Sequence, residues 1–235
     1  MISLIRLLER NIVNREDIFM MKIGILILCF AVLSIAGSFK DKRDGQIYKT
    51  VKIGNQVWMA QNLNYAVDNG YGSWCYDNEY RNCKKYGRLY TYYTAMNACP
   101  SGWHLPSESE WETLFAYVGG LQTAGYVLRS KNERYYAGED RYKFNVLLAG
   151  SYNRYDGHMY QDGRDRWEFS YKGRWAIFRT SSSNVGYYFP GERTDVVRDK
   201  TVEEYEGVSV RCVKDYWHDS NTRRYSHSGN FRIGL

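Results

Sequence analysis

The chain has 235 residues, of which 44% are hydrophobic and 17% aromatic, and its formal net charge is +6. This hydrophobic fraction is ample for a buried core, so the composition excludes a disordered chain. The positive excess is modest and dispersed, with basic pairs such as Lys84-Lys85 and Arg223-Arg224 as the longest clusters, which argues against nucleic acid as a partner. Tyrosine dominates the aromatic residues, and a chain rich in Tyr and Gly predicts short strands and ordered loops.

A secretory leader is predicted at the amino terminus. Residues 23–37 form the only long apolar run; Lys22 precedes it and small residues at 36–38 end it, which is the order of a signal peptide. The run is shorter than the roughly 20 residues that span a bilayer. We therefore expect residues 1–38 to be a leader, with Met21 as an alternative start, and a mature protein that is secreted, periplasmic or at the cell surface. An uncleaved membrane anchor is the alternative.

Four cysteines follow the leader: Cys75, Cys83, Cys99 and Cys212. An even number in an exported chain predicts disulfides, for which three connectivities are possible. Cys75 and Cys83 are separated by a short, turn-rich stretch, so a local bridge is favoured there, and Cys99 then pairs with Cys212. A zinc site is the alternative, but no Cys-x-x-Cys pair and no His at ligand spacing supports it.

The elements before residue 99 are predicted from alternation and turn residues. Gly54-Asn55 is a turn signal between two alternating apolar runs and predicts a β-hairpin. The expected elements are a polar linker at 39–46, strands at 47–51 and 57–60, an ordered loop at 61–86, and a short helix or strand at 89–98.

A helix is predicted directly after Pro106. Ser107 and Glu110 have the spacing of a capping box, in which each side chain bonds a backbone amide at the helix start. Gly119-Gly120 ends the helix because glycine readily adopts left-handed backbone conformations. One apolar stripe at helical spacing is formed by Trp111, Leu114, Phe115 and Val118. Residues 121–128 predict a second short helix.

The rest of the chain predicts strands and loops, with no internal repeat and no second core, so a single domain is expected at 47–215. The elements expected are strands at 144–149, 175–180, 185–189 and 208–213, a long surface loop with small strands at 151–175, and a loose polar tail at 216–235.

Four segments together resemble one protein family. The segments are 51–64 (VKIGNQVWMAQNLN), 87–90 (GRLY), 98–112 (ACPSGWHLPSESEWE) and 207–215 (GVSVRCVKD). In this order they are similar to the Fibrobacter succinogenes major paralogous domain, and the resemblance covers residues 47–215.

The segment 105–112 also resembles a motif of formylglycine-generating enzymes and related sulfatase-modifying proteins. This wider group has a C-type-lectin-like fold. The resemblance therefore implies an α+β, loop-rich, disulfide-stapled domain with short antiparallel strands, one or two helices, and its two ends brought together. It implies no particular function, because such folds include both enzymes and binding proteins.

A noncatalytic binding module for a polysaccharide or a cell-surface protein is the predicted function. The loop at 151–175 is the expected binding face, because aromatic rings can stack on a ligand and carboxylates can accept hydrogen bonds from hydroxyls. The same rings could equally pack their own loop. The candidate residues are Tyr152, Tyr155, Tyr160 and Trp167 for stacking, and Asp156, Asp162 and Asp165 for hydrogen bonding.

Two other functions are weighed against it. A formylglycine-generating-like enzyme needs a pair of reactive cysteines, whereas each of the four cysteines after the leader has an expected structural partner. A calcium-dependent lectin could use oxygen ligands from Asp156 to Glu168, but arginines are interleaved with them and the usual lectin signatures are missing. His104 is expected to form structural hydrogen bonds. We therefore expect no catalytic residues, no metal site and no cofactor.

Overall fold

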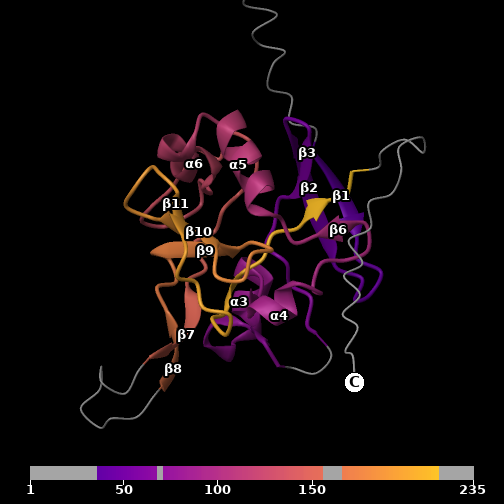
Figure 1. The fold of residues 1–235 in the computed structure, drawn as a ribbon, viewed down its shortest axis with the longest axis vertical. Helices are drawn as coiled ribbons and strands as arrows, with labels where there is room; N and C mark the ends of the chain where they lie inside the picture. The colour runs from indigo at the N-terminus through magenta and orange to yellow at the C-terminus, as the bar shows by residue number, and fades with distance from the viewer. Residues whose placement is uncertain (1–35, 68–70, 156–165, 217–235) are drawn as a thin grey trace, which may run out of the picture.

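A computed structural model of the protein describes residues 36–67, 71–155 and 166–216. Two sheets organise these residues, and the carboxyl-terminal segment contributes one strand to each (Figure 1). The first sheet is antiparallel throughout. Its order is β1 (Ala36–Lys40), β2 (Ile47–Ile53), β3 (Gln56–Met59), β13 (Val213–Lys214) and β6 (Trp103–His104).

The second sheet has six strands, and only the contact between β12 and β9 is parallel. Its order is β11 (Val197–Asp199), β10 (Gly186–Pro190), β9 (Trp175–Arg179), β12 (Val208–Ser209), β5 (Leu89–Tyr90) and β4 (Ser73–Trp74). A separate hairpin consists of β7 (Ser151–Tyr155) and β8 (Arg166–Ser170). The helices are η2 (Tyr76–Asn78), α3 (Tyr80–Tyr86), α4 (Tyr92–Ala95), α5 (Glu108–Tyr117) and α6 (Leu121–Leu128). The domain is thus α+β, as predicted.

The hairpin β2–β3 and the helix α5 form as the sequence predicts. Ile53 pairs with Gln56 across the two-residue turn, where Gly54 adopts a positive φ of 58°. At the start of α5, Ser107 accepts a hydrogen bond from the Glu110 amide, and the Glu110 side chain accepts one from the Ser107 amide. The predicted stripe faces inward, and all four of its side chains are buried.

Several expected elements differ from the structure. Residues 39–46 are the end of β1 and the turn into β2, because β1 pairs with β2 from Ala36↔Val51 to Lys40↔Ile47. The expected loop at 61–86 contains β4, η2 and α3, and 89–98 contains both a strand and a helix. These elements are only two to seven residues long, so tertiary contacts decide them more than local propensity does.

Residues 144–149, expected as a strand, are buried but irregular. Only Val146 makes a β-bridge, to Arg129. Side chains replace the strand ladder here: Arg211 donates to the carbonyl of Phe144, and the Leu148 amide donates to the Glu133 carboxylate. The apolar run therefore predicted the core positions correctly, and the strand predicted from it was wrong.

The expected closing strand at 208–213 divides between the two sheets. Ser209 of β12 pairs with Phe178, whereas Val213 of β13 pairs with Trp58. Between them Cys212 is bonded to Cys99 with a Cα–Cα distance of 5.9 Å, and the second bond joins Cys75 to Cys83 at 4.9 Å. Both predicted disulfides are confirmed. Disulfides of this kind indicate an oxidising environment.

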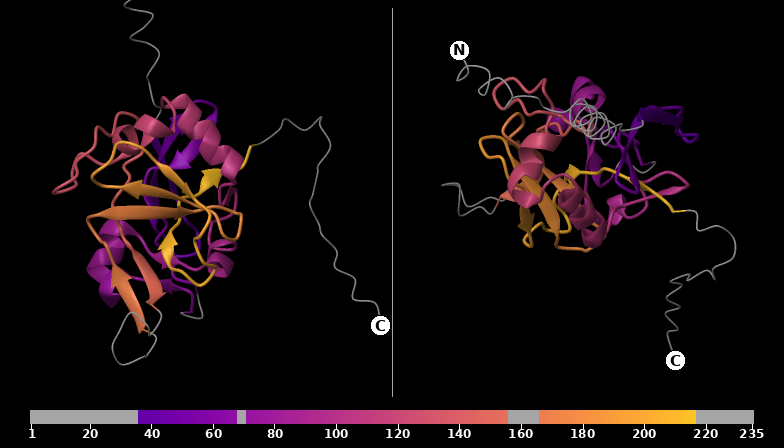
Figure 2. Two further views of the ribbon diagram at one scale, coloured as in Figure 1. Left: turned by 60° about the vertical axis from the view of Figure 1, so that its left-hand side comes forward. Right: turned by 90° about the horizontal axis from the view of Figure 1, so that it is seen from above.

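The larger core is centred on Trp111 of α5. Its ring lies 4.8 Å from Trp58 and 5.5 Å from Phe178, measured between ring centroids, and it is fully buried. This core joins α5 and α6 to β9 and β10 at one end of the molecule, while the β7–β8 hairpin extends from the opposite end (Figures 1 and 2).

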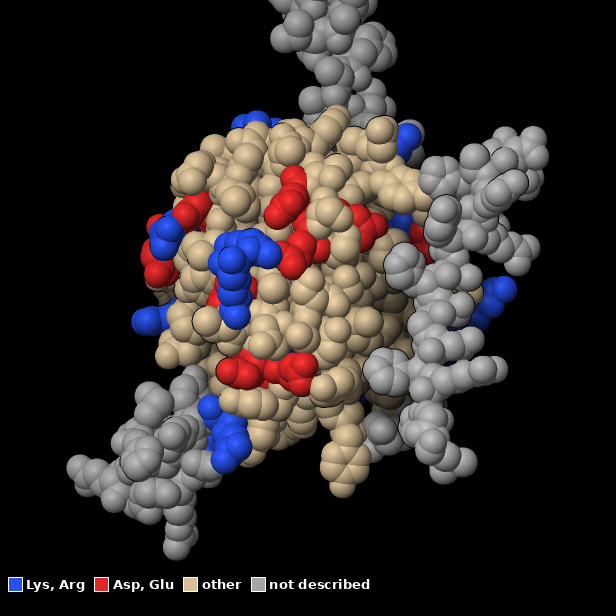
Figure 3. Space-filling model, viewed as in Figure 1, with Lys and Arg blue, Asp and Glu red and all other residues tan. Residues whose placement is uncertain are grey.

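No helix within the described residues has the length and hydropathy to cross a membrane. Basic and acidic side chains form small mixed groups on the face shown in Figure 3.

Candidate functional site

The β7–β8 hairpin carries a row of aromatic rings on one face. In its antiparallel register Tyr152 lies opposite Phe169, and Arg154 lies opposite Trp167. Directly opposed residues and residues two apart point to the same side of a strand pair. Tyr152, Trp167 and Phe169 therefore share one face, and the alternation of the two strands places them there.

Two aromatic residues from other elements extend this row. Trp74 of β4 lies 4.6 Å from Tyr152, and Tyr205, in the connection before β12, lies 5.7 Å from Trp167. Tyr152 and Trp167 are stacked, with centroids 5.5 Å apart. We call the four residues Trp74, Tyr152, Trp167 and Tyr205 the hairpin aromatic face.

Exposure distinguishes this face from the core. Trp167 is 45% exposed and Tyr205 is 44% exposed, while Trp74 and Tyr152 are partly buried beneath them. Burial raises the pKa of the Tyr152 hydroxyl, so that group stays protonated and can donate a hydrogen bond. The face thus offers two broad apolar rings to solvent on a support of two further rings.

A close backbone contact attaches the hairpin to the rest of the domain. The Tyr152 amide donates to the Gly207 carbonyl at 2.9 Å, and the Gly207 amide donates to the Tyr152 carbonyl at 2.8 Å. A Cβ atom at Gly207 would lie 3.0 Å from Cβ of Tyr152 and 3.2 Å from the Trp74 ring. Glycine at this position therefore lets the hairpin, Trp74 and the Tyr205 segment meet.

Buried polar groups fix the segment that presents Tyr205. The fully buried Arg179 donates to the carbonyls of Glu203 and Glu206, and the Tyr92 amide donates to the carbonyl of Glu204 at 2.8 Å. The Tyr93 hydroxyl donates to the Glu204 carboxylate at 2.7 Å. Tyr205 is therefore held in place before any ligand arrives, which lowers the entropic cost of binding.

Glu206 makes this segment sensitive to pH. Burial raises the pKa of its carboxyl group to about 7, although the positive charge of Arg179 and a hydrogen bond with Asn153 act in the opposite direction. The Glu206 carboxyl group therefore changes charge near neutral pH. Its neighbours in the sequence are Tyr205, on the hairpin aromatic face, and Gly207, at the close backbone contact.

The predicted binding residues are only partly placed by the structure. Tyr152 and Trp167 come together on one face, and Tyr155 lies at the end of β7. Asp156, Tyr160, Asp162 and Asp165 lie outside the described residues. Trp74 and Tyr205 were not predicted. They are more than 130 residues apart in sequence, and the only local signal was an aromatic residue beside Cys75 and another near Gly207.

His104 forms structural hydrogen bonds, as expected. Its Nε2 atom lies 2.7 Å from Oε1 of Glu110, and its Nδ1 atom lies 2.6 Å from Oδ1 of Asp215. The hydrogen bond with Glu110 is the largest contribution that raises the pKa of His104 to about 8, the one with Asp215 adds to it, and burial opposes both. In the part of the chain that the structure describes, no group of three or more His, Cys, Asp or Glu could hold a metal ion.

Comparison with known families supports the resemblance found in the sequence. Residues 51–214 match the model of the Fibrobacter succinogenes major domain. The chain belongs to this family. In this Fibrobacter succinogenes major domain the matched region runs from β2 to β13, so it includes both disulfides and the hairpin aromatic face. No curated protein and no solved structure matched the chain.

Proposed function

We propose that this protein is an exported, noncatalytic binding module that holds a polysaccharide against the hairpin aromatic face. The observation that carries the proposal is the pair of adjacent, nearly half-exposed rings of Trp167 and Tyr205. Exposed aromatic rings that touch one another form a binding surface more often than isolated ones do, because they offer contact area at low entropic cost.

A polysaccharide suits this surface chemically. The C–H faces of sugar rings are apolar and flat, so they can lie on aromatic rings, while the sugar hydroxyl groups remain in water or bond polar groups at the edge. The adjacent exposed rings of Trp167 and Tyr205 favour an extended ligand that covers both of them over a compact one. An extended segment of a surface protein is the competing ligand.

The proposed location outside the cytoplasm rests on two features. Lys22 and the apolar run that follows it have the order of a secretory signal, and the two disulfides need an oxidising compartment to form. Placement among C-type-lectin-like folds belongs to the same proposal. It is supported by β13, which lies between β3 and β6 and so returns the end of the domain to its beginning.

The disulfides also favour a noncatalytic role over the enzyme alternative. Formylglycine-generating-like chemistry needs cysteine thiolates, and Cys75, Cys83, Cys99 and Cys212 are all bonded in pairs.

The test is binding of the full chain to a polysaccharide panel. Insoluble cellulose, xylan and chitin are used in pull-down assays, and soluble glucans and mannans in affinity electrophoresis. Wild type should bind at least one of them, and Trp167→Ala or Tyr205→Ala should weaken that binding roughly tenfold. Tyr126→Ala is the matched control, because it removes a ring of similar exposure, 42%, from α6.

Two results would count against the proposal. One is a wild-type protein that binds no polysaccharide in the panel, which would favour a protein ligand. The other is a Trp167→Ala variant that binds as tightly as wild type.

A further inference from the structure

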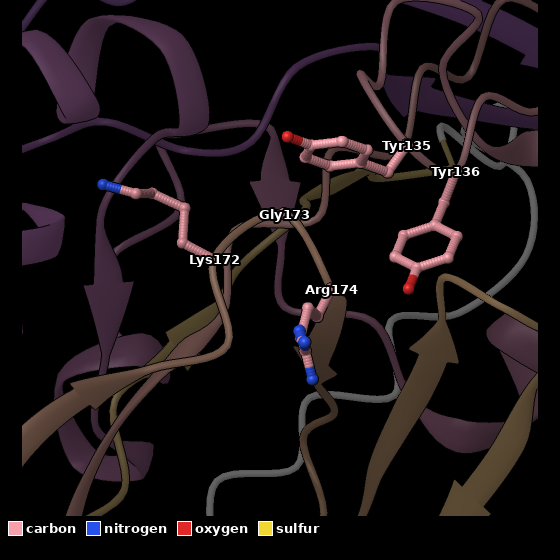
Figure 4. A pocket seen from close by; sticks show the side chains of 5 residues that line it. All are labelled: Tyr135, Tyr136, Lys172, Gly173 and Arg174. Atoms are coloured by element: carbon pink, nitrogen blue, oxygen red, sulfur yellow. The ribbon is translucent and has the colours of Figure 1, made fainter.

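A cavity of about 640 Å³ lies at the base of the hairpin, apart from its aromatic face. One wall comes from the loop after α6 and the other from the turn between β8 and β9 (Figure 4). We call it the tyrosine–arginine pocket; it is lined by Tyr135, Tyr136, Lys172, Gly173 and Arg174.

The two cations of this pocket differ in their availability. Lys172 is already engaged, because its Nζ atom lies 3.1 Å from the Asp77 carboxylate and 4.3 Å from the centre of the Tyr76 ring. Arg174 is exposed, and its guanidinium group makes no ion pair or hydrogen bond with any residue that the structure describes. Figure 4 shows the two side chains pointing in different directions. Arg174 is therefore the cation that a ligand can use, and its planar group suits a carboxylate.

Two aromatic rings of the pocket are arranged differently from each other. Tyr136 is fixed, because its ring packs so closely on Gly191 that a Cβ atom there would lie 2.4 Å from Cδ2 of Tyr136. Tyr135 is 73% exposed; the Arg134 guanidinium lies over one face of its ring, 5.2 Å from the ring centre, and the other face is offered to solvent. A ligand can thus find one ring held in the wall and one ring open for stacking.

Gly173 leaves space for the ligand between these groups. It has a positive φ of 78°, and a Cβ atom built on it meets nothing within 4 Å. Its amide is occupied, because it donates to the Leu148 carbonyl at 2.7 Å, and this bond fixes the turn. The turn therefore presents open backbone beside the Arg174 side chain on a well-anchored segment.

We infer that the tyrosine–arginine pocket binds an acidic sugar unit, with its carboxylate on Arg174 and its ring on Tyr135. The choice of a saccharide rests on the proposed function, whereas the choice of an acidic one rests on Arg174. The pocket is joined to the hairpin aromatic face by contacting side chains, from Lys172 through Tyr76 and Phe169 to Tyr152.

Calorimetry with oligogalacturonate and the full chain tests the inference. Wild type should bind the oligomer, and should bind its methyl ester, which keeps the sugar rings and lacks the charge, at least about tenfold more weakly. Arg174→Gln should bind the acid about tenfold more weakly than wild type does, and should bind the ester with nearly unchanged affinity. Lys52→Gln, which removes one positive charge from an exposed position of strand β2, is the matched control and should bind like wild type.

A second variant tests the pocket without changing its charge. Gly173→Asn should fold, because asparagine tolerates positive φ and Cβ has room, while its side chain occupies the space left for the ligand. It should weaken binding of oligogalacturonate as strongly as Arg174→Gln does. Near-native circular dichroism and melting temperature verify that both variants are folded.

Three outcomes would overturn the inference: no binding of oligogalacturonate, equal binding of its methyl ester, or equal binding of poly-L-glutamate, which carries carboxylates without sugar rings. The neutral polysaccharide panel keeps this failure separate from that of the proposed function. If Trp167→Ala loses a neutral polysaccharide and Arg174→Gln loses nothing, the pocket inference fails and the proposed function stands. If only Arg174→Gln loses binding, the pocket stands and the role of the hairpin aromatic face fails.

Discussion

The two ends of this domain use aromatic residues in opposite ways. At the end formed by α5 and α6, Trp111 is surrounded by other rings and is fully buried. At the hairpin end, Trp167 contacts Tyr152 and Tyr205 but leaves 45% of its surface in solvent. Ring contacts alone therefore do not identify a core. Exposure separates rings that stabilise the fold from rings that are available to a ligand.

The Cys99–Cys212 disulfide should have the largest effect on stability. It closes a loop with a sequence separation of 113, against 8 for Cys75–Cys83 at the hairpin end. On the chain-entropy model the double variant Cys99→Ser/Cys212→Ser should lower the free energy of unfolding by about 4 to 5 kcal/mol. Cys75→Ser/Cys83→Ser should lower it by about 2 to 3 kcal/mol.

Guanidinium unfolding of the oxidised proteins measures both values. Wild type in excess reductant is the control, and its loss in unfolding free energy should be about the sum of the losses in the two double variants. Equal losses for the two bonds would contradict the assignment of the larger stabilising role to the bond that joins the ends of the domain.

Trp111→Ala should come next in size. Removal of this fully buried ring leaves a large cavity among Trp58, Phe115, Phe178 and Tyr187, and such changes cost about 3 to 5 kcal/mol. Urea unfolding followed by far-ultraviolet circular dichroism provides the measurement. Trp111→Phe keeps most of the packing and should lose clearly less unfolding free energy. A similar loss for both variants would contradict the stabilising role of the ring contacts of Trp111.

The pH dependence of stability should show a smaller effect, at His104. Its pKa is raised to about 8 in the folded protein, from about 6.5 for an unperturbed histidine. The stabilisation is therefore complete below pH 6.5 and is lost as the pH rises through 8. Because the side chain is 40% exposed, solvent screening reduces the effect to about 1 kcal/mol or less.

Unfolding free energies at pH 6 and pH 9 measure the contribution of His104 to stability. The difference in unfolding free energy between pH 6 and pH 9 should be smaller in His104→Gln than in wild type. An NMR titration of the wild-type ring should have its midpoint near 8. A midpoint at or below 6.5 would mean that the contacts with Glu110 and Asp215 do not hold the ring in solution.

The sequence predicted best where the signal is local. The capping box of α5, its apolar stripe and the Gly54-Asn55 turn each depend on neighbouring residues, and all three are present. The strand expected at 144–149 is absent because the buried Arg211 and Glu133 satisfy its backbone groups in place of a neighbouring strand. No local pattern can report such distant side chains.

The candidate site divides in the same way. Tyr152 and Trp167 were predicted because both lie in one aromatic segment, whereas Trp74 and Tyr205 join them only through the fold. The disulfides were predicted from number and spacing alone, because four cysteines allow few pairings.

The most direct test of the contrast between the two ends is to measure stability and binding on one preparation of Trp167→Ala. Because Trp167 is nearly half exposed, the free energy of unfolding of the variant should stay within about 1 kcal/mol of wild type. On the same sample, affinity for the polysaccharide that wild type binds should fall roughly tenfold. A loss of stability comparable to that of Trp111→Ala, with binding by the folded fraction unchanged, would contradict the account and assign this ring to the core.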